Sequence, residues 1–311
     1  YHILSSLSSF FSSSVTYEYG TLLANGKYFG RHPEFYGWKE GKRHPYKHYG
    51  TQICYTNVKG AEAVIKETLV ALKRDMTPEI TEVHFGFGDT WNLCLCPECL
   101  EPIRCEDGTV LNPSDDAFRS TQYYRYLNRI ADAVAKARPG LKISTLAYLY
   151  AAVPPKEKLH PNLTVIFCPY VKNDKVPVTE PVNKVWEKRS REWADAGKNI
   201  GIYEYYGDSS DFPRPIADTA MKDMRFWNSL GINTFFSLET YPDVRRRKPE
   251  DDKLAGAWDV SAVEYWCIGR LMWDSSQNAE KLRKEYFRRA YREAAPAVEA
   301  AAALALCRLL P

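Results

Sequence analysis

The sequence predicts an α/β fold, a (β/α)8 barrel of the TIM type, on three observations. Short runs rich in Val, Ile, Phe and Tyr alternate with helical stretches, a pattern typical of parallel βαβ units. The chain has 311 residues, enough for a barrel of about 250 residues followed by further helices. No glycine-rich phosphate loop follows any of these runs, whereas the competing architecture, a doubly wound open sheet, usually carries one.

Six apolar runs have the length and composition of strands that are buried on both faces. They are QICYTN (52–57), EVHFGFGD (82–89), KISTLAYLY (142–150), TVIFCPYV (164–171), NIGIYEYYG (199–207) and INTFFSLET (232–240). An eight-stranded barrel then requires that its first one or two strands lie before Tyr1 or within residues 1–20. We therefore expect a barrel that is truncated at its N-terminus.

Helical patterns separate these runs. The predicted helices cover 61–75, 120–140, 182–199 and 217–231, and three of them end at glycines, the residue that favours helix termination. The apolar tail after residue 255 continues as helices. The expected domain organisation is therefore a barrel over 1–255 and C-terminal helices, packed on the barrel, over 256–311.

Composition and charge exclude several classes of protein. Hydrophobic residues make up 45% of the chain and the net charge is +3, which argues against a disordered chain. No apolar run reaches the roughly 18 residues that a membrane span needs. The small net charge gives no general case for nucleic-acid binding. The oligomeric state cannot be predicted from these features.

Carboxylates stand at the ends of three predicted strands, where barrel enzymes place their active sites. Asp89 follows Gly86 and Gly88, Glu204 lies near the end of its run, and Glu239 ends the last run. Paired carboxylates suit acid/base cleavage of a glycosidic bond. The alternative for each of them alone is a helix cap or an ion pair with Lys or Arg.

Aromatic residues follow the same strand ends, and flat apolar rings can bind sugars. The candidate substrate-binding residues are Trp91, Tyr148, Tyr150, Tyr170, Tyr205, Tyr206 and Tyr241. Each of them can instead belong to the hydrophobic core.

A cluster of cysteines follows Asp89 directly. Cys94, Cys96 and Cys99 have the spacing C-x-C-x2-C, and Cys105 lies six positions further on. This spacing is reasonable for a tetrahedral structural zinc site. An iron–sulfur cluster, local disulfides and free thiols remain alternatives, and no organic cofactor is expected. A catalytic zinc is less favoured because no histidine lies close by in sequence; His84 has the position of a buried strand residue.

Several segments in combination resemble a bacterial family, the domain of unknown function 4838. They are HPEFYGWKEGKR (32–43), QICYTN (52–57), HFGFGDTWNLCLCPEC (84–99), YYRYLNRIADAVAKARPGLKISTLAY (123–148) and the tail AGAWDVSAVEYWCIGRLMWD. The resemblance covers essentially the whole chain.

The resemblance implies a (β/α)8 barrel related to retaining hexosaminidases and α-glucuronidases, and a secreted, periplasmic or cell-surface bacterial protein. The G-x-G-D at 86–89 looks like a hexosaminidase signature in which an Asp-Glu pair acts. Thr90 stands where those enzymes have glutamate, so the sequence does not predict that adjacent pair.

The expected function is hydrolysis of a plant or microbial glycan, with uronic acid or N-acetylhexosamine as candidate components. Asp89 and either Glu204 or Glu239 would supply the acid and its partner. Two rival hypotheses stay open. One is a non-catalytic carbohydrate-binding barrel with a metal-bound cysteine cluster. The other is a metal-dependent hydrolase or redox protein that uses the cysteines directly.

Overall fold

The computed structural model describes residues 14–47, 50–207, 216–239 and 257–301. Six parallel strands form its main sheet, in the spatial order β1-β4-β7-β8-β9-β10. The strands are β1 (Ser14–Glu18), β4 (Glu82–Gly86), β7 (Lys142–Ala147), β8 (Leu163–Phe167), β9 (Ile200–Gly207) and β10 (Thr234–Glu239). This order follows the chain, so each connection leads to the neighbouring strand.

The predicted closed (β/α)8 barrel is wrong. Over the described ranges, β1 is an edge strand that pairs with β4, and β10 is an edge strand that pairs with β9. Closure requires the first and last strands to pair with each other, and six strands in this order leave both edges open. The fold is a mixed α/β structure around a parallel sheet.

Five of the six predicted strand runs contain strands of this sheet, but QICYTN (52–57) does not. The backbone of this segment bonds to loops instead: Cys54 N–H donates to the Phe35 carbonyl at 2.9 Å, and Gln52 N–H donates to the Asn92 carbonyl at 2.9 Å. An isolated antiparallel bridge joins Ile53 to Tyr36. The segment is buried because loops cover it, which gives it the apolar composition of a strand. Strand β1 falls within residues 1–20, where an early strand was expected.

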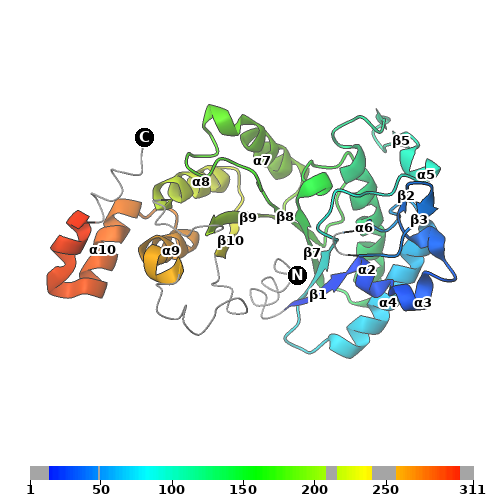
Figure 1. The fold of residues 1–311 in the computed structure, drawn as a ribbon, viewed down its shortest axis with the longest axis horizontal. Helices are drawn as coiled ribbons and strands as arrows, with labels where there is room; N and C mark the ends of the chain where they lie inside the picture. The colour runs from blue at the N-terminus through cyan, green and yellow to red at the C-terminus, as the bar shows by residue number, and fades with distance from the viewer. Residues whose placement is uncertain (1–13, 48–49, 208–215, 240–256, 302–311) are drawn as a thin grey trace. The chain divides into compact units, whose positions relative to one another are not determined.

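The chain divides into two compact units, Tyr1–Cys168 with Glu192–Ile200, and Pro169–Arg191 with Gly201–Pro311. In the first unit, α4 (Val58–Asp75) and α6 (Phe118–Ala137) pack against each other beside β1, β4 and β7 (Figure 1). Their apolar faces, including Val64 and Leu127, are fully buried. The four-residue helices α2 (Tyr19–Leu22), α3 (Asn25–Tyr28) and α5 (Pro97–Leu100) lie in the connections.

Short elements complete the first unit. Two hairpins pair β2 (Trp38–Lys39) with β3 (Lys42–Arg43), and β5 (Ile103–Arg104) with β6 (Val110–Leu111). Two 3-10 helices are η1 (Pro33–Phe35) and η2 (Leu149–Ala151).

The second unit carries α8 (Ala217–Ser229), α9 (Ala257–Trp273) and α10 (Ala279–Tyr291). These helices share one hydrophobic cluster, which includes Met224, Ile268 and Leu282. The helix α7 (Lys184–Ala196) and the 3-10 helices η3 (Pro181–Asn183) and η5 (Arg292–Ala294) complete the elements. The predicted domain boundary at residue 255 lies outside the described residues.

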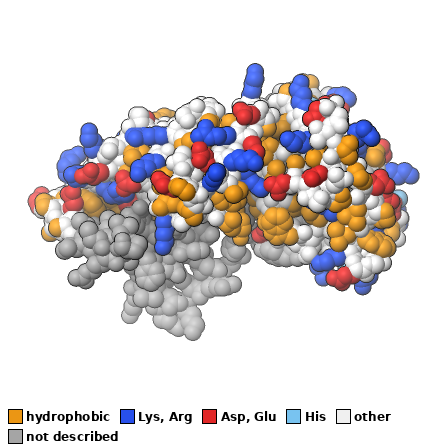
Figure 2. Space-filling model, turned by 90° about the horizontal axis from the view of Figure 1, so that it is seen from above, with side chains coloured by type: hydrophobic (Ala, Val, Ile, Leu, Met, Phe, Trp, Pro, Cys, Tyr) orange, Lys and Arg blue, Asp and Glu red, His pale blue; other side chains and the backbone are white. Residues whose placement is uncertain are grey.

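The surface shows mixed charge. On the face drawn in Figure 2, Lys and Arg side chains are interspersed with Asp and Glu. Within the part of the chain that the structure describes, no helix has both the length and the apolar character needed to cross a bilayer.

Candidate functional site

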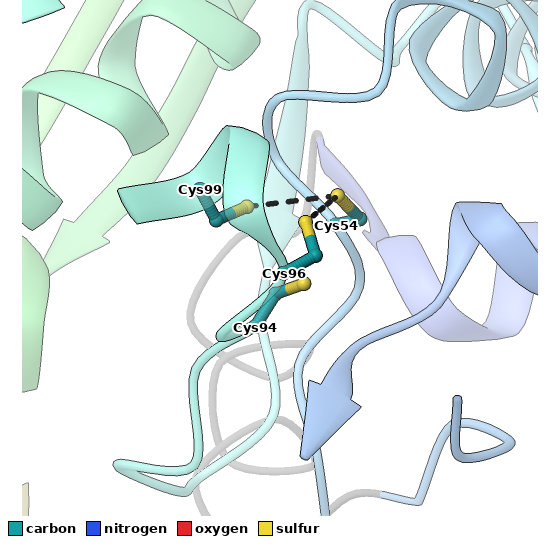
Figure 3. A group of neighbouring side chains, drawn as sticks. All are labelled: Cys54, Cys94, Cys96 and Cys99. Carbon is teal, nitrogen blue, oxygen red and sulfur yellow. Dashed lines mark hydrogen bonds between the residues drawn. The ribbon is translucent and has the colours of Figure 1, made fainter. Parts of the chain in front are cut away.

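Four buried cysteines from two loops of the first unit meet in one place. Their sulfur atoms, on Cys54, Cys94, Cys96 and Cys99, all lie within 4.8 Å of one another. Figure 3 shows the four side chains converging on one small space. The Cys54 sulfur lies 3.7 Å from that of Cys96 and 3.6 Å from that of Cys99. The fold brings together three of the four predicted ligands, Cys94, Cys96 and Cys99. The fourth sulfur atom belongs to Cys54, which the spacing of the motif did not predict.

The fourth predicted ligand, Cys105, lies elsewhere. It belongs to a small hydrophobic cluster under the β5–β6 hairpin, with Ile103, Leu111 and Phe118. It is buried and forms no disulfide, like the other six cysteines among the described residues. Cys105 therefore has the surroundings of a small core residue, and Cys54 takes its place beside the other three sulfur atoms.

Local structure explains how the cysteines converge. Pro97 begins the short helix α5, and the Cys99 N–H donates to the Cys96 carbonyl at 3.0 Å, so a tight turn brings these two thiols together. Gln52, two residues before Cys54, joins the two loops. Its side-chain amide donates to the carbonyls of Gly88 and Thr90, while its carbonyl oxygen accepts from the Gly88 N–H at 3.2 Å.

Hydrogen-bond donors surround the sulfur atoms. Trp38 N–H lies 3.2 Å from the Cys94 sulfur, and the Arg43 guanidinium lies 3.4 Å from it. The Thr56 hydroxyl lies 3.1 Å from the Cys99 sulfur. Arg119 donates to the backbone carbonyls of Cys94 and Cys99. Such donors and nearby positive charge stabilise thiolates, the form in which cysteine binds a metal.

The cluster cannot hold four thiolates without a cation. Hydrogen bonds from Cys94 and Cys99 hold the pKa of Cys54 well below its usual range. The same pairing raises the pKa of Cys99. Burial, followed by interactions with Glu98 and Cys54, raises the pKa of Cys96 to about 12. One negative sulfur thus makes its neighbours harder to ionise, and a divalent cation would remove that conflict.

The sulfur separations fit one tetrahedral ion. Zinc–sulfur bonds of about 2.3 Å in a tetrahedron place the sulfur atoms roughly 3.8 Å apart. The two measured separations of 3.6 and 3.7 Å agree with that value. They are far longer than the disulfide bond length of about 2.05 Å, and all four residues are free cysteines. Of the alternatives, the geometry favours a metal over disulfides.

Asp89 lies at the carboxyl edge of the sheet, in the loop that Gln52 clamps. Its side chain is half-buried. Glu18, also half-buried, ends the neighbouring strand β1, where it stands opposite Gly86 in the parallel register. Tyr148 follows β7 and stacks on Phe87, with ring centroids 4.9 Å apart. Burial raises the pKa of Tyr148, and the charges of Asp89 and Glu18 raise it further, so both carboxylates act on this tyrosine.

Tyr148 and Tyr150 are mostly core residues. They are only 6% and 5% exposed. The Tyr150 hydroxyl shares a hydrogen bond of 2.7 Å with that of Tyr55, inside a group of buried aromatic rings that includes Tyr123. Tyr150 is thus packed and hydrogen-bonded within the protein, whereas Tyr148 is the tyrosine whose pKa the charges of Asp89 and Glu18 raise.

Glu204, in the second unit, is 3% exposed and lies in a buried charge cluster. The Lys172 ammonium lies 3.0 Å from an Asp223 oxygen and 3.5 Å from Glu204 Oε1. Asp223 also accepts from the Tyr206 hydroxyl at 3.1 Å and from the Val178 N–H at 2.6 Å. Asp223 therefore holds most of the donors, and among the described residues Glu204 Oε1 has no hydrogen-bond partner.

Burial raises the pKa of both acids, Glu204 and Asp223, above the usual value of a carboxyl group. Burial and then the charge of Asp223 raise the pKa of Glu204 to about 8, against the lowering effect of Lys172. Burial also raises the pKa of Asp223, which Lys172 and the Val178 N–H oppose. Burial alone would lower the pKa of Lys172, but the two carboxylates outweigh it and raise it. We assign the ion pair to Lys172 and Asp223, with Glu204 protonated at neutral pH.

The remaining predicted residues differ in how far their side chains are exposed to solvent. Trp91 is 66% exposed and Tyr170 is 53% exposed. Tyr206 is buried, and its hydroxyl donates a hydrogen bond to Asp223. Tyr205 is half-buried and contacts Tyr170 edge-on at 5.7 Å. Glu239 ends β10, and its side chain lies outside the described set. Tyr241 also lies outside the described residues.

Comparison with protein families gives a match over most of the chain. The family described as Domain of unknown function (DUF4838) matches residues 5–302. The chain belongs to this family. A comparison with curated proteins finds no match. The family assignment confirms the resemblance seen in the sequence, and it carries no information on substrate or chemistry.

Three features of this family member were missed from its sequence. Cys54 lies 40 residues before Cys94, inside a run that had the composition of a strand. Glu18 closes the run VTYE, which alternates as a strand does and could have been counted. The partnership of Lys172 and Asp223 joins residues 51 positions apart, and no sequence pattern signals it.

Proposed function

We propose that Cys54, Cys94, Cys96 and Cys99 bind one zinc ion in a structural role. The observation that carries this proposal is the mutual approach of four buried sulfur atoms at separations that suit tetrahedral coordination. Four protein thiolates fill the coordination sphere, so no position remains for water or substrate, as is typical of structural zinc. This argues against the rival hypothesis of a catalytic metal.

The role of such an ion follows from the segments that it would join. Cys54 belongs to the loop before α4, and Cys94, Cys96 and Cys99 belong to the connection after β4 that also contains Asp89. Neither loop has regular strand pairing to fix it. An ion that bound both would hold the Asp89 loop in one position, together with the Gln52 clamp.

Elemental analysis tests the zinc proposal. The purified chain is expected to contain one zinc per molecule after dialysis against metal-free buffer. Iron in place of zinc, with the visible absorption of an iron–sulfur centre, would contradict it, as would a protein without bound metal that accepts none on titration.

We further propose that the protein hydrolyses glycosidic bonds at the carboxyl ends of β1 and β4. Parallel α/β folds, closed or open, place their sites at the carboxyl ends of the strands, so this proposal does not need a closed barrel. The observation that favours it is the pair of half-buried carboxylates, Glu18 at the end of β1 and Asp89 in the loop after the adjacent strand β4. The charges of both raise the pKa of Tyr148. Glycosidases use two carboxyl groups, one as proton donor and one as base or nucleophile.

Glu204 fits this chemistry less well than Glu18. Its protonated state at neutral pH would suit a proton donor, but its side chain is almost fully buried against Lys172 and Asp223. A general acid must reach the leaving oxygen of the substrate. We therefore propose Asp89 and Glu18 as the reacting pair, while Glu239 stays a candidate from the sequence.

Asp89→Asn is expected to lower kcat/KM on a cleaved aryl glycoside by about 10²–10⁴-fold, since the amide cannot transfer the proton. The measurement is release of the aryl group from a panel that includes glucuronides and N-acetylhexosaminides. Asp132→Asn, on the exposed face of α6, makes the same change in charge and should leave turnover unchanged. Glu18→Gln should resemble Asp89→Asn.

Two outcomes would decide against this proposal. Equal turnover by Asp89→Asn and wild type would remove Asp89 from the chemistry. Binding of glycans without turnover of any substrate in the panel would favour the alternative, a non-catalytic carbohydrate-binding protein.

A further inference from the structure

A cavity of about 280 Å³ lies in the first unit, beside the cysteine cluster. Residues of α6 line part of it, and Glu98 and the segment from Glu101 to Arg104 line another part. Tyr55 and Thr56, which follow Cys54 directly, complete it. The cavity is apart from the carboxylates that the proposed hydrolysis uses, because neither Asp89 nor Glu18 lines it.

The α6 wall is a regular helix face. Gln122, Arg125, Tyr126 and Arg129 line the cavity, and their spacing of three, four and seven residues places them on one side of the helix. Arg104, from the segment after the cysteines, also lines the cavity. Three guanidinium groups therefore belong to residues around one small space.

Only one of these three arginines is engaged. Arg125 forms an ion pair with Glu157 and donates to the Arg104 carbonyl at 2.9 Å. Among the described residues, the guanidinium groups of Arg104 and Arg129 take part in neither an ion pair nor a hydrogen bond. Tyr126 is buried, and its hydroxyl also has no hydrogen-bond partner in the described structure. The lining thus offers one buried hydroxyl without a partner, on Tyr126, and two exposed guanidinium groups, on Arg104 and Arg129, that no other described protein group engages.

The cavity lining also contains hydrogen-bond acceptors, the carboxyl groups of two glutamates. Glu98 and Glu101, both exposed, also line the cavity. Carboxylates accept hydrogen bonds from hydroxyl groups and repel a second anion. A ligand that satisfies both kinds of group carries one compact anionic end and several hydroxyls.

We propose that this cavity binds a small polyhydroxylated anion, such as a sugar acid or a sugar phosphate. Its oxyanion would meet Arg104 and Arg129, since guanidinium groups match carboxylate and phosphate oxygens in a bidentate geometry. Its hydroxyls would meet Glu98 and Glu101. The volume is close to the lower end of the roughly 300–1,000 Å³ range of small-molecule sites, which suits one sugar ring.

Calorimetric titration of the whole chain tests this site without any need for turnover. The probes are gluconate, glucose 6-phosphate and neutral glucose. At least one of the two anions is expected to bind at least tenfold more tightly than glucose, and the tighter of the two identifies the anionic group. Arg129→Gln should weaken that binding at least tenfold, and Arg104→Gln should act in the same direction.

Arg138→Gln is the matched control, since Arg138 follows the same helix, is exposed, and lies away from the cavity lining. It should leave the affinity unchanged. Circular dichroism shows whether each variant is folded. Equal affinity for glucose and both anions, no binding of either anion, or equal losses in Arg129→Gln and Arg138→Gln would each overturn the proposal. Loss of glycoside turnover alone would not affect it.

Discussion

Cys54→Ala is expected to lower the melting temperature far more than Cys105→Ala does, although both remove one buried sulfur. Removing a ligand from a four-thiolate zinc site sacrifices binding energy that reaches about 10–16 kcal/mol in zinc-finger peptides. This chain has its own core, so only the loops around the site depend on the ion. A loss of several kcal/mol, or about 10 °C or more, is the expected result.

Cys105→Ala serves as the control because Cys105 lies in a hydrophobic cluster away from the four sulfur atoms. Its loss should cost about 1–2 kcal/mol through a small cavity. A strong zinc chelator should lower the wild-type melting temperature to that of Cys54→Ala, and should leave the variant unchanged. Equal melting temperatures for the two alanine variants, with no effect of the chelator, would rule out a structural ion at Cys54.

Glu204→Gln is expected to make stability less dependent on pH. The pKa of Glu204 is about 8 in the folded protein, above its value of 4.5 when unfolded, so the folded state binds the extra proton. Its contribution to stability is therefore fully present below about pH 4.5 and is lost as the pH rises through about 8. Glutamine mimics the neutral acid at every pH, and should preserve a contribution on the order of a few kcal/mol in alkaline solution.

The measurement is the free energy of unfolding in urea between pH 5 and pH 9. Wild type should lose stability towards pH 9 more steeply than Glu204→Gln, and the two should be similar near pH 5. Glu293→Gln, at an exposed glutamate, should follow the wild-type profile. If Glu204 were instead the ionised partner of Lys172, glutamine would cost about 3–5 kcal/mol near neutral pH, and that result would contradict the assignment.

Much of the secondary structure could be predicted because it depends on local sequence. The helix predicted over 120–140 is α6, Phe118–Ala137, which ends before Pro139 and Gly140. Proline cannot continue a helix, and Gly140 adopts a φ of 87° that favours glycine. The buried strands β4, β7 and β8 likewise follow from runs of Val, Ile and Phe.

The closed barrel could not be predicted from these same patterns. Closure depends on how many strands pair and on whether the first meets the last, and neither property is local. The run at 52–57 shows the difficulty, since Ile53 and Cys54 are buried by loops and not by strand neighbours. A loop that is buried in this way has the same apolar composition as a buried strand, so composition could not distinguish the two.

The candidate site was predictable in part for a similar reason. The motif C-x-C-x2-C lies within one loop, so its three sulfur atoms meet through local geometry. Cys105 was nearest in sequence, but the β5–β6 hairpin holds it in another cluster. Cys54 reaches the site through tertiary structure, by way of the bonds that Gln52 and Cys54 make to distant loops.

X-ray absorption at the zinc edge of the purified protein tests the zinc proposal most directly, because it reports the number and kind of atoms bound to the metal. We predict four sulfur neighbours at about 2.3 Å, and neither nitrogen nor oxygen in the first coordination sphere. In Cys54→Ala, any zinc that remains should have three sulfur neighbours, while Cys105→Ala should keep four. A wild-type spectrum with nitrogen or oxygen ligands, or one changed by Cys105→Ala and not by Cys54→Ala, would contradict the four-thiolate site.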